Sequence, residues 1–228
     1  SGSIKNALVV GTEVLSRFVN WKDRGTCILF GDGAGAFVLQ ASDIPGGIMS
    51  AVMHSDGSGA DTLTLPGGGS HFPASELTIH EGKHFVHMDG KEVFRFATRV
   101  MGRAVLEALE QVKMTTDDIH CIIPHQANYR IIETAAKYLK MPLEKFVINV
   151  DRYGNTSTAS IPIATVEAIQ NGRLKSGDKV VFVGFGGGLT WGAMVVEWTG
   201  PIPAKKQIHP EQYRLFARLR SFVRRAIR

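Results

Sequence analysis

Two polar side chains, His125 and Asn155, are of the types that stabilise negative charge on an oxygen atom. A neutral imidazole N–H and a side-chain amide N–H can donate hydrogen bonds to the same oxygen, and such a pair stabilises an enolate or a tetrahedral oxyanion. Each residue also has a structural interpretation. His125 can be a hydrogen-bonded structural histidine, and Asn155 lies in Gly-Asn-Thr-Ser, which is typical of a turn and a helix N-cap.

Three polar or glycine-rich segments follow apolar runs and would bring these residues together. They are residues 124–128, 154–157 and 184–188. In α/β sheets, ligand sites form beyond the C-terminal ends of the strands. If the three runs are strands of one sheet, we expect their ends to converge on one pocket.

The sequence offers no obvious nucleophile for this pocket. Cys27 lies in the apolar run 26–30 with no helix N-terminus after it, and a buried thiol stays protonated. Cys121 precedes His125 by four strand residues, or roughly 13 Å at about 3.3 Å per residue, which is too far for a thiolate–imidazole pair. We expect both cysteines to be core residues. The sequence also lacks a Gly-x-Ser-x-Gly nucleophile elbow.

Two other kinds of site fit the sequence poorly. His80, His84 and His87 are close together, but no acidic or cysteine partner completes a metal ligand set, so we expect no metal. The glycine-rich segment 31–36 lacks the spacing and the following helix of a dinucleotide fingerprint. It suits a hairpin or a close approach of two backbones, with Asp32 as a turn-former.

The elements that must position these residues alternate between strands and helices. Apolar runs predict strands at 6–11, 26–30, 37–39, 119–123, 146–150, 180–183 and 193–198. Helical spacing of apolar residues predicts helices at 89–113, 130–139 and 159–170, while 55–75 is expected to be loop. The run 6–11 is expected to be buried, and the last two strands to pair as antiparallel neighbours. This alternation is typical of a layered α/β sheet.

Composition places the chain among globular proteins with a sizeable core. It has 228 residues, of which 44% are hydrophobic and 21% charged. No apolar run approaches the roughly 18 residues that a membrane span requires, and the N-terminus does not resemble a signal peptide. Two cysteines are too few for a disulfide framework, so we expect a cytoplasmic location.

The positive charge is concentrated in residues 201–228. Eight Lys or Arg residues against Glu211 give this tail a net charge of +7, which leaves −2 for the rest of a chain whose total is +5. The nearly neutral body argues against nucleic acid as a partner. The apolar residues of the tail fall at helical spacing: Leu215, Phe216, Leu219, Phe222, Val223, Ala226 and Ile227. Such a helix can bind an anionic membrane surface, dock an acidic carrier protein, or pack on its own protein.

Six segments, in one order and at compatible spacing, resemble β-ketoacyl-acyl-carrier-protein (ACP) synthase III of bacterial fatty-acid synthesis. They are Asp-Arg-Gly-Thr at 23–26, Phe-Gly-Asp-Gly-Ala-Gly-Ala at 30–36, Met-Asp-Gly-Lys-Glu-Val-Phe at 88–94, Pro-His-Gln-Ala-Asn at 124–128, Asp-Arg-Tyr-Gly-Asn-Thr-Ser at 151–157, and Phe-Gly-Gly-Gly-Leu-Thr-Trp-Gly at 185–192. The resemblance covers about residues 3–198. It implies a thiolase-like layered α/β/α/β/α fold, incomplete in this chain, and a homodimer.

The resemblance also implies an activity and roles for individual residues. The family condenses acyl-CoA with malonyl-ACP to give 3-oxoacyl-ACP, carbon dioxide and coenzyme A, with no cofactor besides these thioester substrates. His125 and Asn155 match its decarboxylation and oxyanion residues, and Phe185 matches a phenylalanine beside the active site. Substrate and carrier contacts are implied by three further matches: Asn128 near the pantetheine arm, Arg24 on the adenine of coenzyme A, and Arg130 in carrier-protein docking.

The chain departs from the family at both ends. The family's acyl-accepting cysteine opens a buried helix that would lie about 30 residues before Ser1, as the resemblance implies. We therefore expect a fragment, with 1–80 as the remainder of an N-terminal half, 81–200 as the C-terminal half, and 201–228 as a basic extension. Two alternatives remain: a related acyltransferase or secondary-metabolite synthase on the same fold, and a non-catalytic partner subunit.

Overall fold

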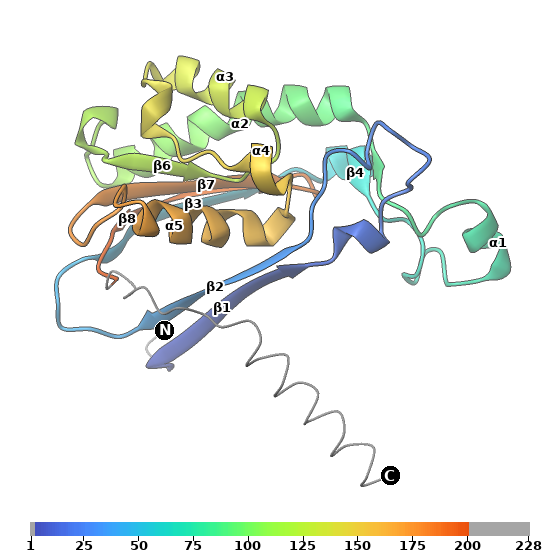
Figure 1. Cartoon of the computed structure of the whole chain (residues 1–228), viewed down its shortest axis with the longest axis horizontal. Coiled ribbons are helices and arrows are strands. Elements are labelled where there is room, and N and C mark those ends of the chain that lie inside the picture. Colours follow the sequence, from blue (N-terminus) through green and yellow to red (C-terminus); the bar gives the residue numbers. More distant parts are fainter. Residues whose placement is uncertain (1–2, 201–228) are drawn as a thin grey trace, which may run out of the picture.

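A four-stranded mixed sheet forms the centre of the computed structural model, which describes residues 3–200 (Figure 1). Its strands are β3 (Gly47–Ser55), β6 (Cys121–Pro124), β7 (Lys179–Gly186) and β8 (Thr190–Glu197), in the order β3-β8-β7-β6. Strand β6 runs parallel to β7, and β8 is antiparallel to both β7 and β3. The predicted antiparallel pairing of the last two strands is confirmed.

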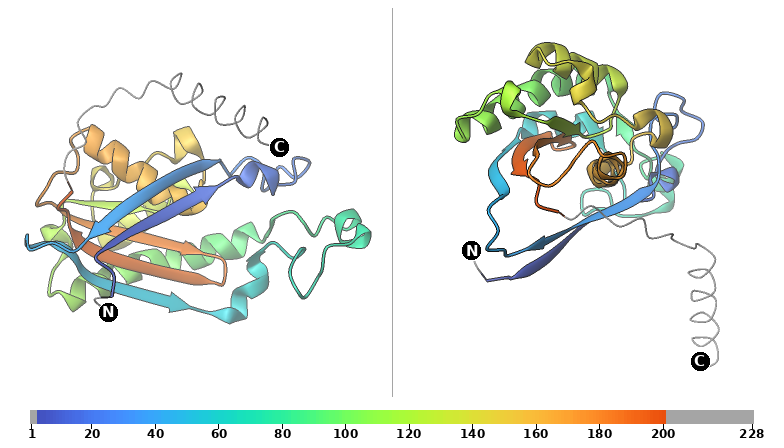
Figure 2. Two further views of the ribbon diagram at one scale, coloured as in Figure 1. Left: turned by 90° about the horizontal axis from the view of Figure 1, so that it is seen from below. Right: turned by 60° about the vertical axis from the view of Figure 1, so that its left-hand side comes forward.

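Further layers cover both faces of this sheet. Helices α2 (Gly90–Gln111) and α3 (Tyr129–Leu139) pack on one face, and α5 (Ser160–Gln170) packs on the other. A hairpin of β1 (Asn6–Glu13) and β2 (Gly33–Gln40) lies on the outer side of α5, so that α5 is enclosed between two sheets (Figure 2). Residues 3–200 therefore supply the order α/β/α/β, four of the five layers that the family resemblance implies.

The three long helices begin and end close to where apolar periodicity predicts them. The Asp89 carboxylate caps α2 by accepting hydrogen bonds from the backbone N–H groups of Lys91 and Glu92, each at 3.0 Å. The helix ends before Lys113, which has a left-handed φ of 55°. Helix α5 carries Pro162 in its first turn, where the missing N–H costs no helical hydrogen bond.

Glycines let the hairpin approach the segment that leads into α5. A Cβ atom on Gly31 would lie 2.0 Å from the carbonyl oxygen of Tyr153, and one on Gly35 would lie 2.8 Å from the Pro162 ring. The close backbone approach expected for the glycine-rich segment is thus confirmed. The alternative of a hairpin within this segment is not, because β2 pairs with β1.

Two of the predicted strands are wrong. Residues 26–29 form turns, and Phe30 makes only an isolated bridge with Asn155. Phe146 likewise makes one parallel bridge with Ile122, after which the chain enters the short helix α4 (Val150–Tyr153). Phe146 and Val147 are buried in the core as irregular backbone, whereas Ile28 of the first run is 68% exposed.

Shorter elements complete the described residues. The long segment 55–75 contains a 3₁₀ turn at Gly57–Thr62 and strand β4 (Leu63–Thr64), which pairs with β5 (His87–Met88). Helix α1 (Glu76–His80) projects away from the layers (Figure 1). Further 3₁₀ turns are Leu15–Arg17, Thr116–Asp118, Leu143–Lys145 and Ser157–Ala159.

The expected division of the chain at residue 80 remains a prediction. Strand β3 precedes this boundary, yet it is the edge strand of the sheet that β6, β7 and β8 form. The expected basic helix of the tail falls on residues 201–228, outside the described residues. Within residues 3–200, no helix has both the length and the apolar character needed to cross a bilayer.

Strand β1 is less buried than its apolar sequence suggests. Leu8 is 65% exposed and Val10 is 55% exposed. The expectation of a buried strand is wrong for the described residues, because α5 covers one face of the hairpin and no layer of residues 3–200 covers the other.

Candidate active site

The three predicted segments meet at one pocket with a volume of about 300 Å³. Four polar side chains line it, from His125, Asn128, Asn155 and Ser157, and Phe185 lies among the apolar ones. The walls come from the end of β6, the end of β7, the start of α2, the segment before α5 and the turns that precede β2. The predicted convergence is confirmed. An apolar pocket with a few convergent polar groups is typical of a ligand site.

His125 is held at the end of β6 by both its backbone and its ring. Its N–H donates to the carbonyl oxygen of Val183 on β7 at 2.7 Å. Its Nδ1 lies 2.7 Å from the hydroxyl of Ser160, and its ring meets Phe185 edge to face, with ring centroids 5.4 Å apart. Burial lowers the pKa of the imidazole to about 4, so the ring is neutral at pH 7. A neutral imidazole carries one N–H and can donate without adding charge.

Asn155 is fixed so that its amide nitrogen remains free. Its Oδ1 accepts a hydrogen bond from the backbone N–H of Ser157 at 2.8 Å. This contact assigns the oxygen and the nitrogen of the amide, and Nδ2 has no partner among the described residues. The backbone is also held, because Asn155 N–H donates to Leu29 at 2.8 Å and the Asn155 carbonyl accepts from Gly31 at 2.9 Å. Asn155 can therefore present N–H donors to the pocket.

Phe185 and Asn128 also line the pocket. Besides His125, the Phe185 ring contacts Phe96 of α2, with ring centroids 6.2 Å apart. Asn128 caps α3, since its Oδ1 accepts from the backbone N–H of Arg130 at 2.8 Å. The turn that the sequence offered as an alternative for Asn155 is also observed, because Asn155 Oδ1 accepts from the backbone N–H two residues on, as Asn128 Oδ1 does.

Arg24 and Arg130 lie outside the pocket lining. Both are exposed; Arg24 directly precedes the lining residue Gly25, and Arg130 follows the lining residue Asn128 by two positions. The side chains of these two arginines make no hydrogen bond or ion pair to the part of the chain that the structure describes. Their predicted contacts with coenzyme A and a carrier protein remain predictions.

Neither cysteine lines the pocket. Cys121 is buried in β6, and burial raises the pKa of its thiol to about 11, so it is protonated at neutral pH. Cys27 is only half-buried and lies in a turn, 4.0 Å from the carbonyl oxygen of Trp21. The prediction that Cys27 is a core strand residue is therefore wrong, because residues 26–29 form turns.

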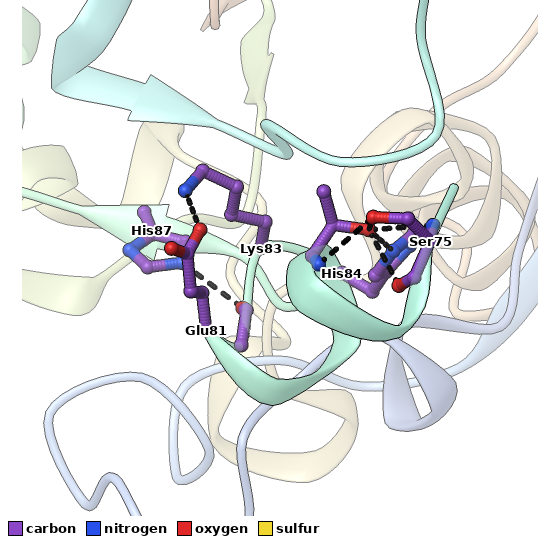
Figure 3. Close-up of polar contacts among 7 residues, drawn as sticks. Ser75, Glu81, Lys83, His84 and His87 are labelled. Atoms are coloured by element: carbon purple, nitrogen blue, oxygen red, sulfur yellow. Dashed lines mark hydrogen bonds and ion pairs between the residues drawn. The ribbon is translucent and has the colours of Figure 1, made fainter. Parts of the chain in front are cut away.

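Two of the three neighbouring histidines, His84 and His87, make structural contacts around α1 (Figure 3). His84 Nε2 lies 3.0 Å from the Thr78 hydroxyl in the helix cap, and His87 Nε2 lies 3.2 Å from the carbonyl oxygen of Gly82. Glu81 pairs with Lys83. No set of three potential ligands suited to a metal occurs within residues 3–200.

Asp32 has a role beyond forming a turn. Its carboxylate accepts hydrogen bonds from the backbone N–H and hydroxyl of Ser16, at 2.8 and 2.6 Å, and these bonds lower its pKa. It therefore ties the start of β2 to the 3₁₀ turn that follows β1.

Sequence reasoning missed two residues that support the pocket from behind. Ser160 contacts His125 Nδ1 from the first turn of α5. Gln126 is buried, donates to the carbonyl oxygens of Pro124 and Val147, each at 2.9 Å, and accepts from Asn149 N–H at 2.9 Å. The signal for Gln126 was its position beside His125. Ser160 gave none, because its contact depends on how α5 packs against β6.

Comparison with known proteins identifies a family for this arrangement. Residues 109–198 match the family described as 3-oxoacyl-[acyl-carrier-protein] synthase III C terminal, and residues 1–57 match 3-oxoacyl-[acyl-carrier-protein] synthase III. The β-ketoacyl-[acyl-carrier-protein] synthase III of Desulfitobacterium hafniense is 54% identical over 199 residues, which are 87% of this chain and 60% of that protein. The chain thus spans about 60% of the length of this relative.

Solved structures agree with the sequence relatives. The β-ketoacyl-[acyl-carrier-protein] synthase III of Thermus thermophilus is similar with a TM-score of 0.80 and 46% identity, over 88% of this chain and 61% of that one. A priming β-ketosynthase from a polyketide biosynthetic pathway has a TM-score of 0.75 and 34% identity, over 88% and 59%. The expected thiolase-like fold is confirmed for the region that is covered. By the matched sequence and the matched fold, this chain belongs to the β-ketoacyl-[acyl-carrier-protein] synthase III family.

Proposed function

We propose that this chain carries the oxyanion-stabilising half of a condensing enzyme that joins an acyl group from acyl-CoA to malonyl-ACP. The products are 3-oxoacyl-ACP, carbon dioxide and coenzyme A. One observation supports this most: His125 and Asn155 line the same largely apolar pocket, and each has its other polar atom tied to the protein. Donors fixed in advance stabilise developing negative charge more than mobile ones do.

The proposed chemistry divides into three steps around a covalent thioester. A cysteine thiolate attacks the acyl-CoA carbonyl, and the thiolate of coenzyme A leaves. Malonyl-ACP then loses carbon dioxide, and the electron pair of the broken carbon–carbon bond forms an enolate. His125 and Asn155 donate hydrogen bonds to the enolate oxygen. The enolate carbon attacks the acyl-cysteine carbonyl, and the carbon–sulfur bond breaks to restore the thiolate.

The acyl-accepting cysteine is proposed to come from the part of the enzyme that corresponds to the uncovered 40% of the relatives. Cys121 is buried and protonated, and Cys27 does not line the pocket. No other cysteine occurs in the sequence. The same uncovered part would supply the expected homodimer contact.

The substrates and partners follow from the same proposal. Coenzyme A thioester and carrier protein are the substrates, with no other cofactor. Asn128 is proposed to contact the pantetheine arm, Arg24 the adenine, and Arg130 the carrier protein. Exposed arginines near a pocket suit such acidic partners, because guanidinium groups bind phosphate and carboxylate. A cytoplasmic location remains our expectation.

A second activity on the same site has one observation in its favour. The polyketide priming β-ketosynthase shares the fold at 34% identity, against 54% for the Desulfitobacterium hafniense relative. The fatty-acid reaction is therefore the main proposal. A panel of acyl-CoA primers of different length and branching would separate the two.

The test uses the purified chain and a fusion to the part of the Desulfitobacterium hafniense relative that this chain does not cover, which the resemblance implies is N-terminal. Each is incubated with radiolabelled acyl-CoA and malonyl-ACP. We expect labelled β-ketoacyl product from the fusion and none from the chain alone. Turnover by the chain alone that is abolished by Cys27→Ser or Cys121→Ser would overturn the assignment of the nucleophile. A folded fusion without turnover would contradict the proposed function.

A further inference from the structure

The hydroxyl of Ser160 is enclosed and has a single partner. The residue is 2% exposed, at the first position of α5, and its Oγ lies 2.7 Å from His125 Nδ1. Among residues 3–200, this is the one hydrogen bond of its side chain. The direction of that bond determines which nitrogen of His125 carries the hydrogen.

Hydrogen-bond accounting favours one direction. A neutral imidazole has one N–H and one bare nitrogen, while a hydroxyl has one hydrogen and two lone pairs. If Nδ1–H donated to Ser160, the hydroxyl hydrogen would be buried without an acceptor, and such groups are rare and costly. If the hydroxyl donates to Nδ1, both groups are satisfied and the imidazole hydrogen lies on Nε2.

We propose that Ser160 is a positioning residue that donates its hydroxyl hydrogen to Nδ1 and so holds His125 in the tautomer with its hydrogen on Nε2. Nε2 has no partner among residues 3–200, and the ring lines the pocket, so this N–H is available to a substrate oxygen. The use of that donor in catalysis rests on the proposed function, whereas the tautomer itself does not.

The same short segment fixes the second donor. Ser157, three residues before Ser160, donates its backbone N–H to Asn155 Oδ1 and thereby turns the Asn155 amide nitrogen away from that contact. Ser157 does this with a left-handed φ of 48°. The segment 157–160 thus satisfies the acceptor atom of each of the two pocket side chains. It leaves the His125 ring and the Asn155 amide as hydrogen-bond donors to the pocket, and two such donors suit a carbonyl or enolate oxygen.

The test measures the tautomer directly in the full 228-residue chain. Histidine labelled with nitrogen-15 is incorporated, and long-range proton–nitrogen correlation spectra are recorded at pH 7. His125→Gln assigns the signals. We expect an unprotonated Nδ1 and a protonated Nε2 in the wild type. Ser160→Ala should shift both nitrogens toward a mixture of tautomers.

The matched control is Thr165→Val, because Thr165 is also buried in α5, and its hydroxyl bonds to the Ile161 carbonyl rather than to His125. It should leave the His125 signals unchanged. A wild-type His125 protonated on Nδ1 would overturn the inference even if Ser160→Ala failed to fold. An unchanged tautomer in a folded Ser160→Ala chain would do the same.

A second arm addresses catalysis in the fusion described above. Ser160→Ala should slow malonyl decarboxylation about tenfold, while Thr165→Val should not. Unchanged decarboxylation in Ser160→Ala would contradict the positioning role. If the wild-type fusion itself shows no decarboxylation, the proposed function fails, and the tautomer spectra still decide the inference about Ser160.

Discussion

The central sheet and the β1–β2 hairpin are both rich in apolar residues, but only the sheet is covered on both faces by the described chain. Val180, Val181 and Ile122 are 0% exposed in the sheet, where α2 and α3 pack on one side and α5 on the other. In the hairpin, Val38 is 76% exposed and Leu8 is 65% exposed. Similar strand sequences therefore differ in burial because of the layers beside them.

This difference separates the region that the described chain packs by itself from the region that a further layer would cover. The sheet and its helices hold His125 and Phe185 at the ends of β6 and β7. The hairpin packs against the segment before α5 through its glycines, and no layer of residues 3–200 covers its outer face. We expect the first region to govern chemistry and stability, and the second to govern association.

The largest expected effect is on chemistry at the sheet ends. In the fusion enzyme, His125→Ala and Asn155→Ala should each lower malonyl decarboxylation by about 10²–10³-fold, because each removes one preorganised donor. Release of labelled carbon dioxide measures this. Acyl transfer to the cysteine should fall less, and Cys27→Ser should stay within a few-fold of the wild type. Equal loss in both steps would show that the two residues act on folding instead.

A core substitution in the sheet should give the largest loss of stability. Ile122→Ala should lower the free energy of unfolding by about 2–5 kcal/mol, since it removes three carbons from a closed core and leaves a cavity. Urea denaturation of the 228-residue chain measures it. A loss below about 1 kcal/mol would indicate that the sheet is loosely packed.

The buried imidazole should make stability depend on pH. The pKa of His125 is about 4 in the folded protein, against an ordinary value of 6.5. The unfolded chain therefore binds a proton first as the pH falls, and the free energy of unfolding should decrease between pH 6.5 and pH 4. The loss should reach about 3 kcal/mol, at about 1.4 kcal/mol per unit of pKa. His125→Gln should weaken the dependence of the unfolding free energy on pH in this range. If the wild type and the variant lose stability in parallel, the His125 imidazole is not buried as described.

The smallest effect on stability is expected in the hairpin. Val38→Ala should change the free energy of unfolding by no more than about 0.5 kcal/mol, because the side chain is already exposed. Combined with Leu8→Ser, it should reduce self-association and the binding of a fluorescent hydrophobic probe. Analytical ultracentrifugation checks the first effect. A wild-type chain that is monomeric and does not bind the probe would remove the distinction between the two regions.

Sequence patterns predicted the covered region better than the irregular one. Helices α2, α3 and α5 follow a clear period of apolar residues, and β7 and β8 contain the apolar runs 180–183 and 193–196. The runs around Phe30 and Phe146 are also apolar but form irregular backbone, each with a single bridge. Burial alone does not distinguish a strand from packed irregular backbone.

The sequence predicted the main polar residues of the pocket but not the residue that holds His125 in place. The positions and types of His125 and Asn155 in the sequence predicted that both would line one pocket, and both do. The contact of Ser160 with His125 joins residues 35 positions apart. It depends on the rotation of α5 about its axis, which no local pattern records.

The backbone bonds between Asn155 and the turn at Leu29 also bear on when the pocket forms during synthesis. Asn155 N–H donates to Leu29, and its carbonyl accepts from Gly31, so residues more than a hundred positions apart close one wall. A ribosome must release the segment beyond Asn155 before this closure can occur. Closing so long a loop comes late, after local helices have formed. Slow hydrogen exchange at the Asn155 amide would therefore report, in one signal, that the newly made chain has assembled its pocket.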